Sequence, residues 1–140
     1  MSQQNVEAVR RQHEHFSRTG EVLSEIYQAD AEWMAAREDP DAATHRGPEA
    51  IQRYFAQWLG MFEDTDFRAE ELIDSGDKVF AWIRFSGKGT TSGAPVEMEL
   101  AQIWTFRGGK VERVEEYFDR RQALEAAGLS EQDVHPDSSD

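Results

Sequence analysis

The sequence predicts an α+β domain in which helices come first and an antiparallel sheet follows. Three observations predict this class. Over residues 5–27 and 48–62, apolar side chains recur every three or four positions, the period of a helix with one buried face. After Asp64 they alternate with polar ones, as in strands. The connections between the alternating stretches are short and contain glycine, which is typical of hairpins.

The first half of the chain supplies the helices. We expect a helix over residues 5–18, with His13 on its apolar stripe, and a short second helix over 21–27. A short strand containing Trp33 is expected over 31–36, followed by a polar loop over 37–46. The third helix begins at Pro48, which needs no hydrogen bond at a first helical position. Its wide apolar stripe consists of Ile51, Tyr54, Phe55, Trp58, Leu59 and Phe62.

The second half supplies the sheet. Four strands are expected over residues 67–74, 78–91, 96–106 and 111–119, and a last short helix over 122–127. Because their connections are short, consecutive strands must be antiparallel neighbours. The two middle strands are long enough to bend around the aromatic third helix. A sheet curved in this way leaves one internal cavity, so we expect one pocket for a small molecule.

Composition narrows the function classes. The 140 residues include 28 acidic and 15 basic ones, a formal net charge of −13 that disfavours nucleic acid and anionic membranes as partners. Without cysteine there are no disulfides and no thiolate zinc site. The sequence contains neither a secretory signal pattern nor a long apolar run, so we expect a cytoplasmic protein. One domain is expected over residues 1–129, with an acidic flexible tail over 130–140.

Six stretches in this order resemble the SnoaL-like branch of the NTF2-like superfamily. They are DAEW at 30–33, HRGPEAI at 45–51, LIDSGDKV at 72–79, AQIWTFRGGKV at 101–111, EEYFD at 115–119 and ALEAAGL at 123–129. The resemblance implies a cone of three N-terminal helices packed on a curved antiparallel sheet that encloses one pocket. The superfamily includes polyketide cyclases, ketosteroid isomerases, dehydratases, epoxide hydrolases and members with no known activity, so it implies a pocket and no particular reaction.

The resemblance also implies a homodimer formed through the outer face of the sheet. The strand over 78–91 fits that arrangement, because Phe80 and Trp82 make one side apolar while Val79, Ala81 and Ile83 make the other side apolar. A thicker core within one chain is the alternative explanation.

The predicted catalytic residues are Asp119, Gln102 and His45. SnoaL-type cyclases carry an acid/base aspartate at the place of Asp119, although a carboxylate in front of a helix also serves as an N-cap. Gln102 is the one polar side chain in the cavity-facing row of its strand, where it either orients a substrate oxygen or is satisfied within the core. His45 lies in a loop over the cavity, suited to proton transfer or simply solvated.

Aromatic side chains are the predicted walls of the pocket. They are Trp33, Tyr54, Trp58, Trp82, Trp104 and Tyr117. Each belongs either to the ligand site or to the core, since aromatic residues serve both purposes. Tyr117 shares a face with Asp119 in a regular strand, whereas a bulge would exchange the two faces.

Two functions are expected from different classes. The first is a cofactor-independent isomerase, cyclase or lyase acting on a carbonyl or polyketide-like compound, with no metal. The second is a non-catalytic ligand-binding or dimerising module on the same fold. Ketosteroid isomerases carry a base in the first strand and a tyrosine on the first helix; Met34-Ala35 and Gln12 occupy those places, which argues against steroid isomerisation.

Overall fold

The computed structural model describes residues 2–36 and 43–134. Along the chain the elements are α1 (Ser2–Thr19), the 3-10 turn η1 (Ser24–Ile26), β1 (Tyr27–Met34), β2 (Thr44–Arg46), α2 (Pro48–Gly60), β3 (Phe62–Ser75), β4 (Lys78–Gly89), β5 (Pro95–Arg107), β6 (Lys110–Tyr117), α3 (Arg120–Ala126) and α4 (Glu131–Val134). The predicted α+β class, with helices first and a hairpin-linked sheet second, is confirmed.

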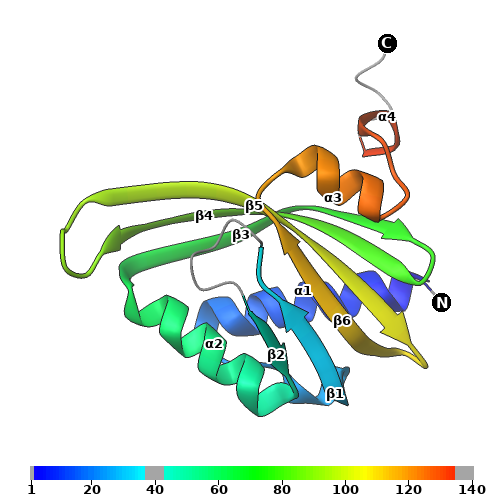
Figure 1. The fold of residues 1–140 in the computed structure, drawn as a ribbon, viewed down its shortest axis with the longest axis horizontal. Coiled ribbons are helices and arrows are strands. Elements are labelled where there is room, and N and C mark those ends of the chain that lie inside the picture. Colours follow the sequence, from blue (N-terminus) through cyan, green and yellow to red (C-terminus); the bar gives the residue numbers. More distant parts are fainter. Residues whose placement is uncertain (1, 37–42, 135–140) are drawn as a thin grey trace.

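Six strands form one sheet in the order β2-β1-β6-β5-β4-β3. The hairpins β3–β4, β4–β5 and β5–β6 are antiparallel, as the short turns predicted. The pair β1–β6 is parallel, which no turn could reveal because more than 70 residues separate the two strands. This pairing joins the first half of the chain to the second and closes the curved sheet around α1 and α2 (Figure 1).

The two faces of the sheet have different coverings. On the inner face, α1 and α2 bury the main core, which includes Val9, Ile51 and Trp104. On the outer face, α3 packs on a smaller cluster that contains Phe80, Ile103 and Leu124 (Figure 1). The inner cluster is the one that surrounds the pocket.

Two boundaries in the first half differ from those predicted. The expected helix over 21–27 is only the turn η1, because Tyr27 already pairs with Val111 of β6. The third helix ends at Gly60, and Phe62 begins β3 by pairing with Gly89. In both places residues with a helical apolar pattern instead form backbone pairs with a strand that is distant in sequence.

The predicted loop over 37–46 contains a strand at its end. In β2, His45 pairs with Trp33 of β1, while residues 37–42 lie outside the described part of the chain. In the predicted tail, Glu131–Val134 forms one helical turn, and residues 135–140 are likewise outside it. Among the described residues, no helix is both long and apolar enough to cross a membrane.

The apolar outer side of β4 is covered within the chain itself. Phe80 is fully buried against the α3 cluster, and the guanidinium of Arg120 lies 5.5 Å from the ring centroid of Phe80 and 4.8 Å from that of Trp82. This is the thicker-core alternative. The homodimer stays a prediction, which sedimentation velocity can check.

Candidate functional site

One small cavity lies between the inner face of the sheet and the two long helices. It has a volume of about 50 Å³, well below the ~300–1,000 Å³ of sites for drug-sized ligands. Aromatic side chains form most of its wall: Phe16, Trp33, Tyr54, Phe55, Trp58, Phe67 and Trp104. These dimensions and walls suit a partly apolar molecule of few non-hydrogen atoms.

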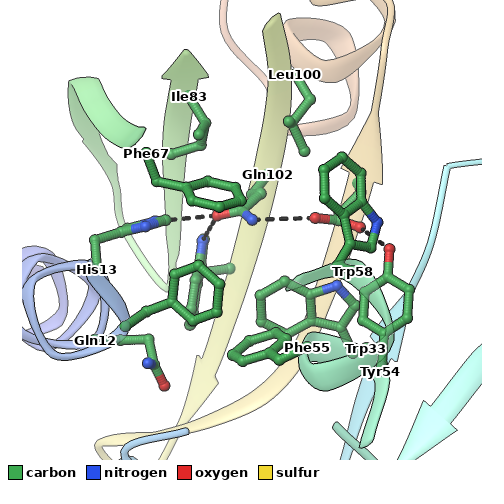
Figure 2. Close-up of a pocket in the computed structure, with 13 residues that line it drawn as sticks. Gln12, His13, Trp33, Tyr54, Phe55, Trp58, Phe67, Ile83, Leu100 and Gln102 are labelled. Carbon is green, nitrogen blue, oxygen red and sulfur yellow. Dashed lines mark hydrogen bonds between the residues drawn. The ribbon is translucent and has the colours of Figure 1, made fainter. Parts of the chain in front are cut away.

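A row of hydrogen bonds crosses the cavity from α1 to α2, with Gln102 at its centre (Figure 2). The amide oxygen of Gln102 accepts from Trp104 Nε1 at 3.0 Å and contacts His13 Nε2 at 3.1 Å. Its amide nitrogen donates to Glu116 Oε2 at 3.1 Å. Gln102 is only 5% exposed, and its three neighbours provide the hydrogen-bond partners that a buried amide needs.

The network also assigns the proton on His13. The indole of Trp104 can only donate, so the Gln102 atom that faces it is the carbonyl oxygen. The same oxygen faces His13 Nε2, which therefore carries the hydrogen and donates. Burial lowers the pKa of His13 to about 4, and the hydrogen bond to Gln102 offsets part of that shift. His13 is consequently a neutral donor at physiological pH.

Glu116 supplies the carboxylate of the site. Its Oε1 accepts from the hydroxyl of Tyr54 at 2.9 Å, and its Oε2 accepts from Gln102. Tyr54 comes from α2 and Gln102 from β5, so two separate elements hold the carboxylate in place. A carboxylate fixed at an aromatic wall can accept a proton from a bound molecule.

Gln12 lies on α1 beside His13 but has a structural role. Its amide oxygen accepts from Leu23 N at 2.9 Å and from the Tyr27 hydroxyl at 2.7 Å, and its nitrogen donates to Glu21 O at 3.1 Å. These three bonds tie the segment after α1 to the helix. They fix the helix that carries His13.

Trp33 differs from Trp104 in its hydrogen bonding. Its side chain is 2% exposed and lines the cavity, yet its Nε1 has no hydrogen-bond partner among the described residues. Buried donors are rarely left unsatisfied, so this N–H is a candidate contact for a bound molecule.

Five of the nine predicted site residues line the cavity. They are Gln102, Trp33, Tyr54, Trp58 and Trp104. Strand alternation and the helical stripe placed them correctly, because both patterns report which face of an element is buried.

The other four predicted residues lie elsewhere. Asp119 is exposed, and its Oδ1 accepts from Gln122 N at 3.1 Å as the N-cap of α3. Tyr117 and Trp82 pack with the outer cluster beneath α3. His45 stacks on the ring of Tyr54, with centroids 4.5 Å apart, so it lies beside the wall without lining the cavity.

Sequence reasoning missed Glu116 and treated His13 only as a core residue. In β6, a regular continuation of the hairpin would turn Glu115 and Tyr117 toward the cavity. A register shift between Thr105 and Phe106 of β5 turns Glu116 there instead. The available signal was the apolar pair Val114 and Phe118, which share the face of Glu116.

No group of three or more His, Cys, Asp or Glu side chains that could hold a metal ion occurs in the described part of the chain. The polar groups at the cavity are a carboxylate, a neutral imidazole, two amides, a phenol and three indoles. These groups are suited to hydrogen bonding and proton transfer.

The fold and the site define a SnoaL-like domain: a curved sheet and the helices packed on it enclose a small, largely aromatic cavity. The family model of the SnoaL-like domain matches residues 7–114. The chain therefore belongs to the SnoaL-like family, as the sequence resemblance predicted. A search of curated proteins finds no match.

Several solved structures have the same fold as this chain. A hypothetical protein from Catenulispora acidiphila with a ketosteroid isomerase-like fold, in complex with trimethylamine, is 20% identical with a TM-score of 0.68, over 87% of this chain and 92% of that one. TerC, co-crystallised with polyporic acid, is 22% identical with a TM-score of 0.71, over 89% and 98%. A putative SnoaL-like polyketide cyclase from Jannaschia is 19% identical with a TM-score of 0.71, over 83% and 85%. At these identities the likeness establishes the fold alone.

Proposed function

We propose that the protein is a cofactor-independent acid–base enzyme that moves a proton at a carbon next to the carbonyl group of a small, partly apolar molecule. The observation that carries this proposal is the position of Glu116, a carboxylate held by Tyr54 and Gln102 at the wall of an aromatic cavity. The structural neighbours add support, since one is described as a putative polyketide cyclase, another has a ketosteroid isomerase-like fold, and two were crystallised with small organic molecules.

The proposed step needs only one base. The Glu116 carboxylate takes a proton from the carbon beside the carbonyl group, and the C–H electron pair moves into the carbonyl system to form an enolate. The carboxylic acid then returns the proton to the same or a conjugated carbon, which completes an exchange or an isomerisation. Neither an oxidant nor a metal takes part, so atoms and electrons balance within the substrate and Glu116.

Tyr54 and Gln102 have positioning roles in this proposal. Both donate to Glu116, so they hold its carboxylate in one orientation and stabilise its charged form. The neutral His13 in turn orients the Gln102 amide through its oxygen. A base fixed by groups that are themselves fixed loses little freedom when the substrate binds.

Cyclopent-3-enone tests the proposal, because moving one proton converts it to the conjugated cyclopent-2-enone. Proton NMR in D2O follows both the loss of the proton next to the carbonyl group and the isomerisation. We expect the protein to accelerate both over buffer and Glu116→Gln to lose at least about 100-fold of the rate. Glu115→Gln is the matched control, because Glu115 is the neighbouring residue on the outer face, where Tyr117 bonds to it.

A folded Glu116→Gln protein with the wild-type rate would contradict the role of Glu116. The second candidate function, a non-catalytic binding module, is favoured by the continuous row of bonds from His13 to Tyr54, in which the polar groups satisfy one another. It predicts saturable binding of cyclopent-3-enone with no isomerisation above that in buffer.

A further inference from the structure

The Trp33 indole is a buried hydrogen-bond donor, and its lack of an acceptor within the described chain indicates what kind of ligand the cavity would bind. Trp33 is 2% exposed, it lines the cavity, and its Nε1–H has no acceptor within the described chain. The second buried indole of the cavity, Trp104, gives its N–H to Gln102 at 3.0 Å. Of the three indoles that line the cavity, Trp33 and Trp104 are buried, and the described part of the chain provides an acceptor for only one of these two.

The ring of Trp33 is held rigidly. Phe55 and Trp104 contact it edge to face, at centroid distances of 5.0 and 5.4 Å and interplanar angles of 85° in both cases. Its backbone lies between two strands, since it pairs with His45 of β2 and with Val114 of β6. A donor fixed from several sides cannot turn away to find a partner, so its N–H is organised before a ligand arrives.

We propose that the Nε1–H of Trp33 donates to the carbonyl oxygen of the bound molecule. This inference rests on the proposed function and specifies its ligand class: a small neutral ketone or enone with one acceptor oxygen on an otherwise apolar body. An indole can only donate, so the atom that meets it must be an acceptor. The aromatic walls around Trp33 suit the hydrocarbon part of such a molecule.

The same contact assists the proposed reaction. When Glu116 removes a proton, negative charge develops on the carbonyl oxygen, and a donor already directed at that oxygen bonds more strongly to the enolate than to the ketone. Trp33 therefore binds the reacting oxygen while Glu116 acts at the neighbouring carbon. The two residues come from β1 and β6, which are adjacent strands.

Two ligands of nearly equal shape isolate this contact. Cyclopentanone carries the acceptor oxygen, and methylenecyclopentane has a CH2 group in its place. The dissociation constants of both are measured by titration of the wild type and of Trp33→Phe. We expect Trp33→Phe to weaken the binding of cyclopentanone at least about fivefold more than the binding of methylenecyclopentane, which corresponds to the loss of one hydrogen bond. Trp82→Phe, on the outer face beneath α3, is the control and should leave the ratio unchanged.

A spectroscopic measurement on the wild type covers the case in which Trp33→Phe fails to fold. The four tryptophans give four indole N–H signals in a 15N-resolved spectrum. We expect the Trp33 signal to move downfield with cyclopentanone and much less with methylenecyclopentane. An unmoved Trp33 signal, an equal loss of affinity for both ligands in Trp33→Phe, or no binding of either ligand would overturn the inference.

Failure here is distinguishable from failure of the proposed function. Suppose that Glu116→Gln still prefers cyclopentanone to methylenecyclopentane, and that neither the wild type nor any variant isomerises cyclopent-3-enone. Trp33 then recognises a carbonyl group in a non-catalytic pocket. If isomerisation depends on Glu116 but the ligand preference does not depend on Trp33, only the inference about Trp33 falls.

Discussion

Gln102 and Glu116 lie directly opposite each other on β5 and β6, and the amide of Gln102 donates to the carboxylate at 3.1 Å. This relationship depends on one irregularity. Regular pairing from Arg107–Lys110 would set Gln102 opposite Glu115. The register shift leaves Glu112 outside the pairing and moves every later residue of β6 by one position, which reverses its faces.

Gln102 should be important for stability as well as for the site. Gln102→Leu would leave the N–H groups of Trp104 and His13 without their acceptor, and Trp104 is fully buried. We expect the free energy of unfolding to fall by about 2–4 kcal/mol, because each buried donor left unsatisfied costs roughly 1–3 kcal/mol. Urea denaturation followed by tryptophan fluorescence measures the change.

The matched control is Gln122→Leu, at an exposed position of α3. This substitution should change the free energy of unfolding by less than about 0.5 kcal/mol. Equal stability of the Gln102 and Gln122 variants would mean that the hydrogen bonds of Gln102 contribute nothing net.

His13 should make stability depend on pH. Burial depresses its pKa from 6.5 to about 4, so the unfolded chain binds a proton more readily than the folded one between these values. The contribution of the neutral His13 to stability is therefore fully present above pH 6.5 and is lost as pH falls toward 4. Between pH 7 and 5 the loss is at most about 2 kcal/mol, an upper bound because His13 keeps some exposed surface.

Urea midpoints at pH 7 and pH 5 check this expectation in the wild type and in His13→Leu. The variant removes the titrating group, so its stability should fall less over that interval than that of the wild type. His15→Gln on the same helix should lose as much stability between pH 7 and pH 5 as the wild type does. If His13→Leu also loses that much, His13 is not the group responsible.

The inner row of β5 and the aromatic stripe of α2 could be predicted because each follows a regular period over many residues. Gln102 and Trp58 were assigned to the cavity on that basis, and both line it. Glu116 could not be assigned from a regular period, because one unpaired residue reverses the faces of β6. Only the apolar pair Val114 and Phe118 indicates that reversal in the sequence. Nor could Tyr27 be assigned to a strand, since its partner Val111 is distant in sequence.

Asp119 should affect stability without affecting the pocket. Its carboxylate caps α3, so Asp119→Ala should lower the free energy of unfolding by about 1 kcal/mol. Asp119→Asn should retain most of that contribution, because asparagine is an equally good cap. Both variants should isomerise cyclopent-3-enone at the wild-type rate in the NMR assay. A large loss of rate in Asp119→Asn at unchanged stability would restore the original acid/base prediction for this residue.

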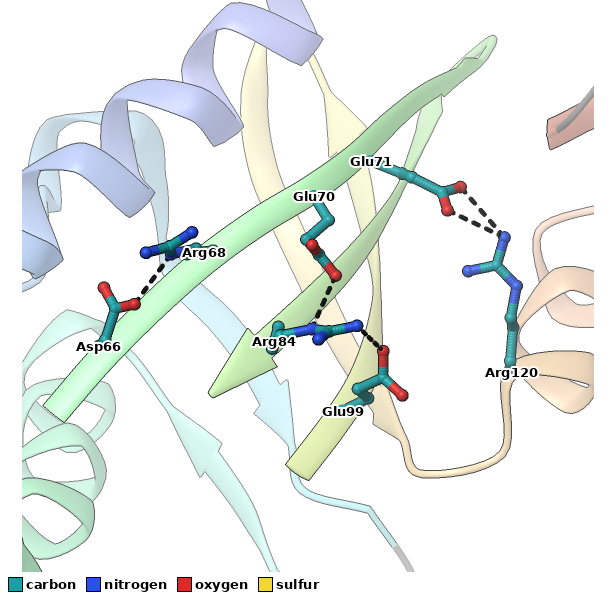
Figure 3. Close-up of polar contacts among 7 residues, drawn as sticks. All are labelled: Asp66, Arg68, Glu70, Glu71, Arg84, Glu99 and Arg120. Atoms are coloured by element: carbon teal, nitrogen blue, oxygen red, sulfur yellow. Dashed lines mark hydrogen bonds and ion pairs between the residues drawn. The ribbon is translucent and has the colours of Figure 1, made fainter. Parts of the chain in front are cut away.

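The ion pairs on the outer face of the sheet should differ in their contribution to stability according to burial (Figure 3). Arg120 has a side chain 19% exposed, donates to Glu71 at 3.0 Å and to Glu131 at 2.7 Å, and lies over Trp82. Arg120→Met should therefore destabilise the protein by about 1–2 kcal/mol, through lost ion pairs and lost packing of the arginine stem.

Arg84 is the matched comparison, because it too bonds to two carboxylates, Glu70 at 3.0 Å and Glu99 at 3.1 Å, but is 51% exposed. Water and salt screen such pairs, so Arg84→Met should leave the urea midpoint almost unchanged. Adding 0.5 M NaCl should reduce the difference between Arg120→Met and the wild type only in part, since contact with the Trp82 ring and burial of the stem do not depend on salt. Equal destabilisation by the two substitutions would show that the number of ion pairs, and not their burial under α3, determines the stability of this face.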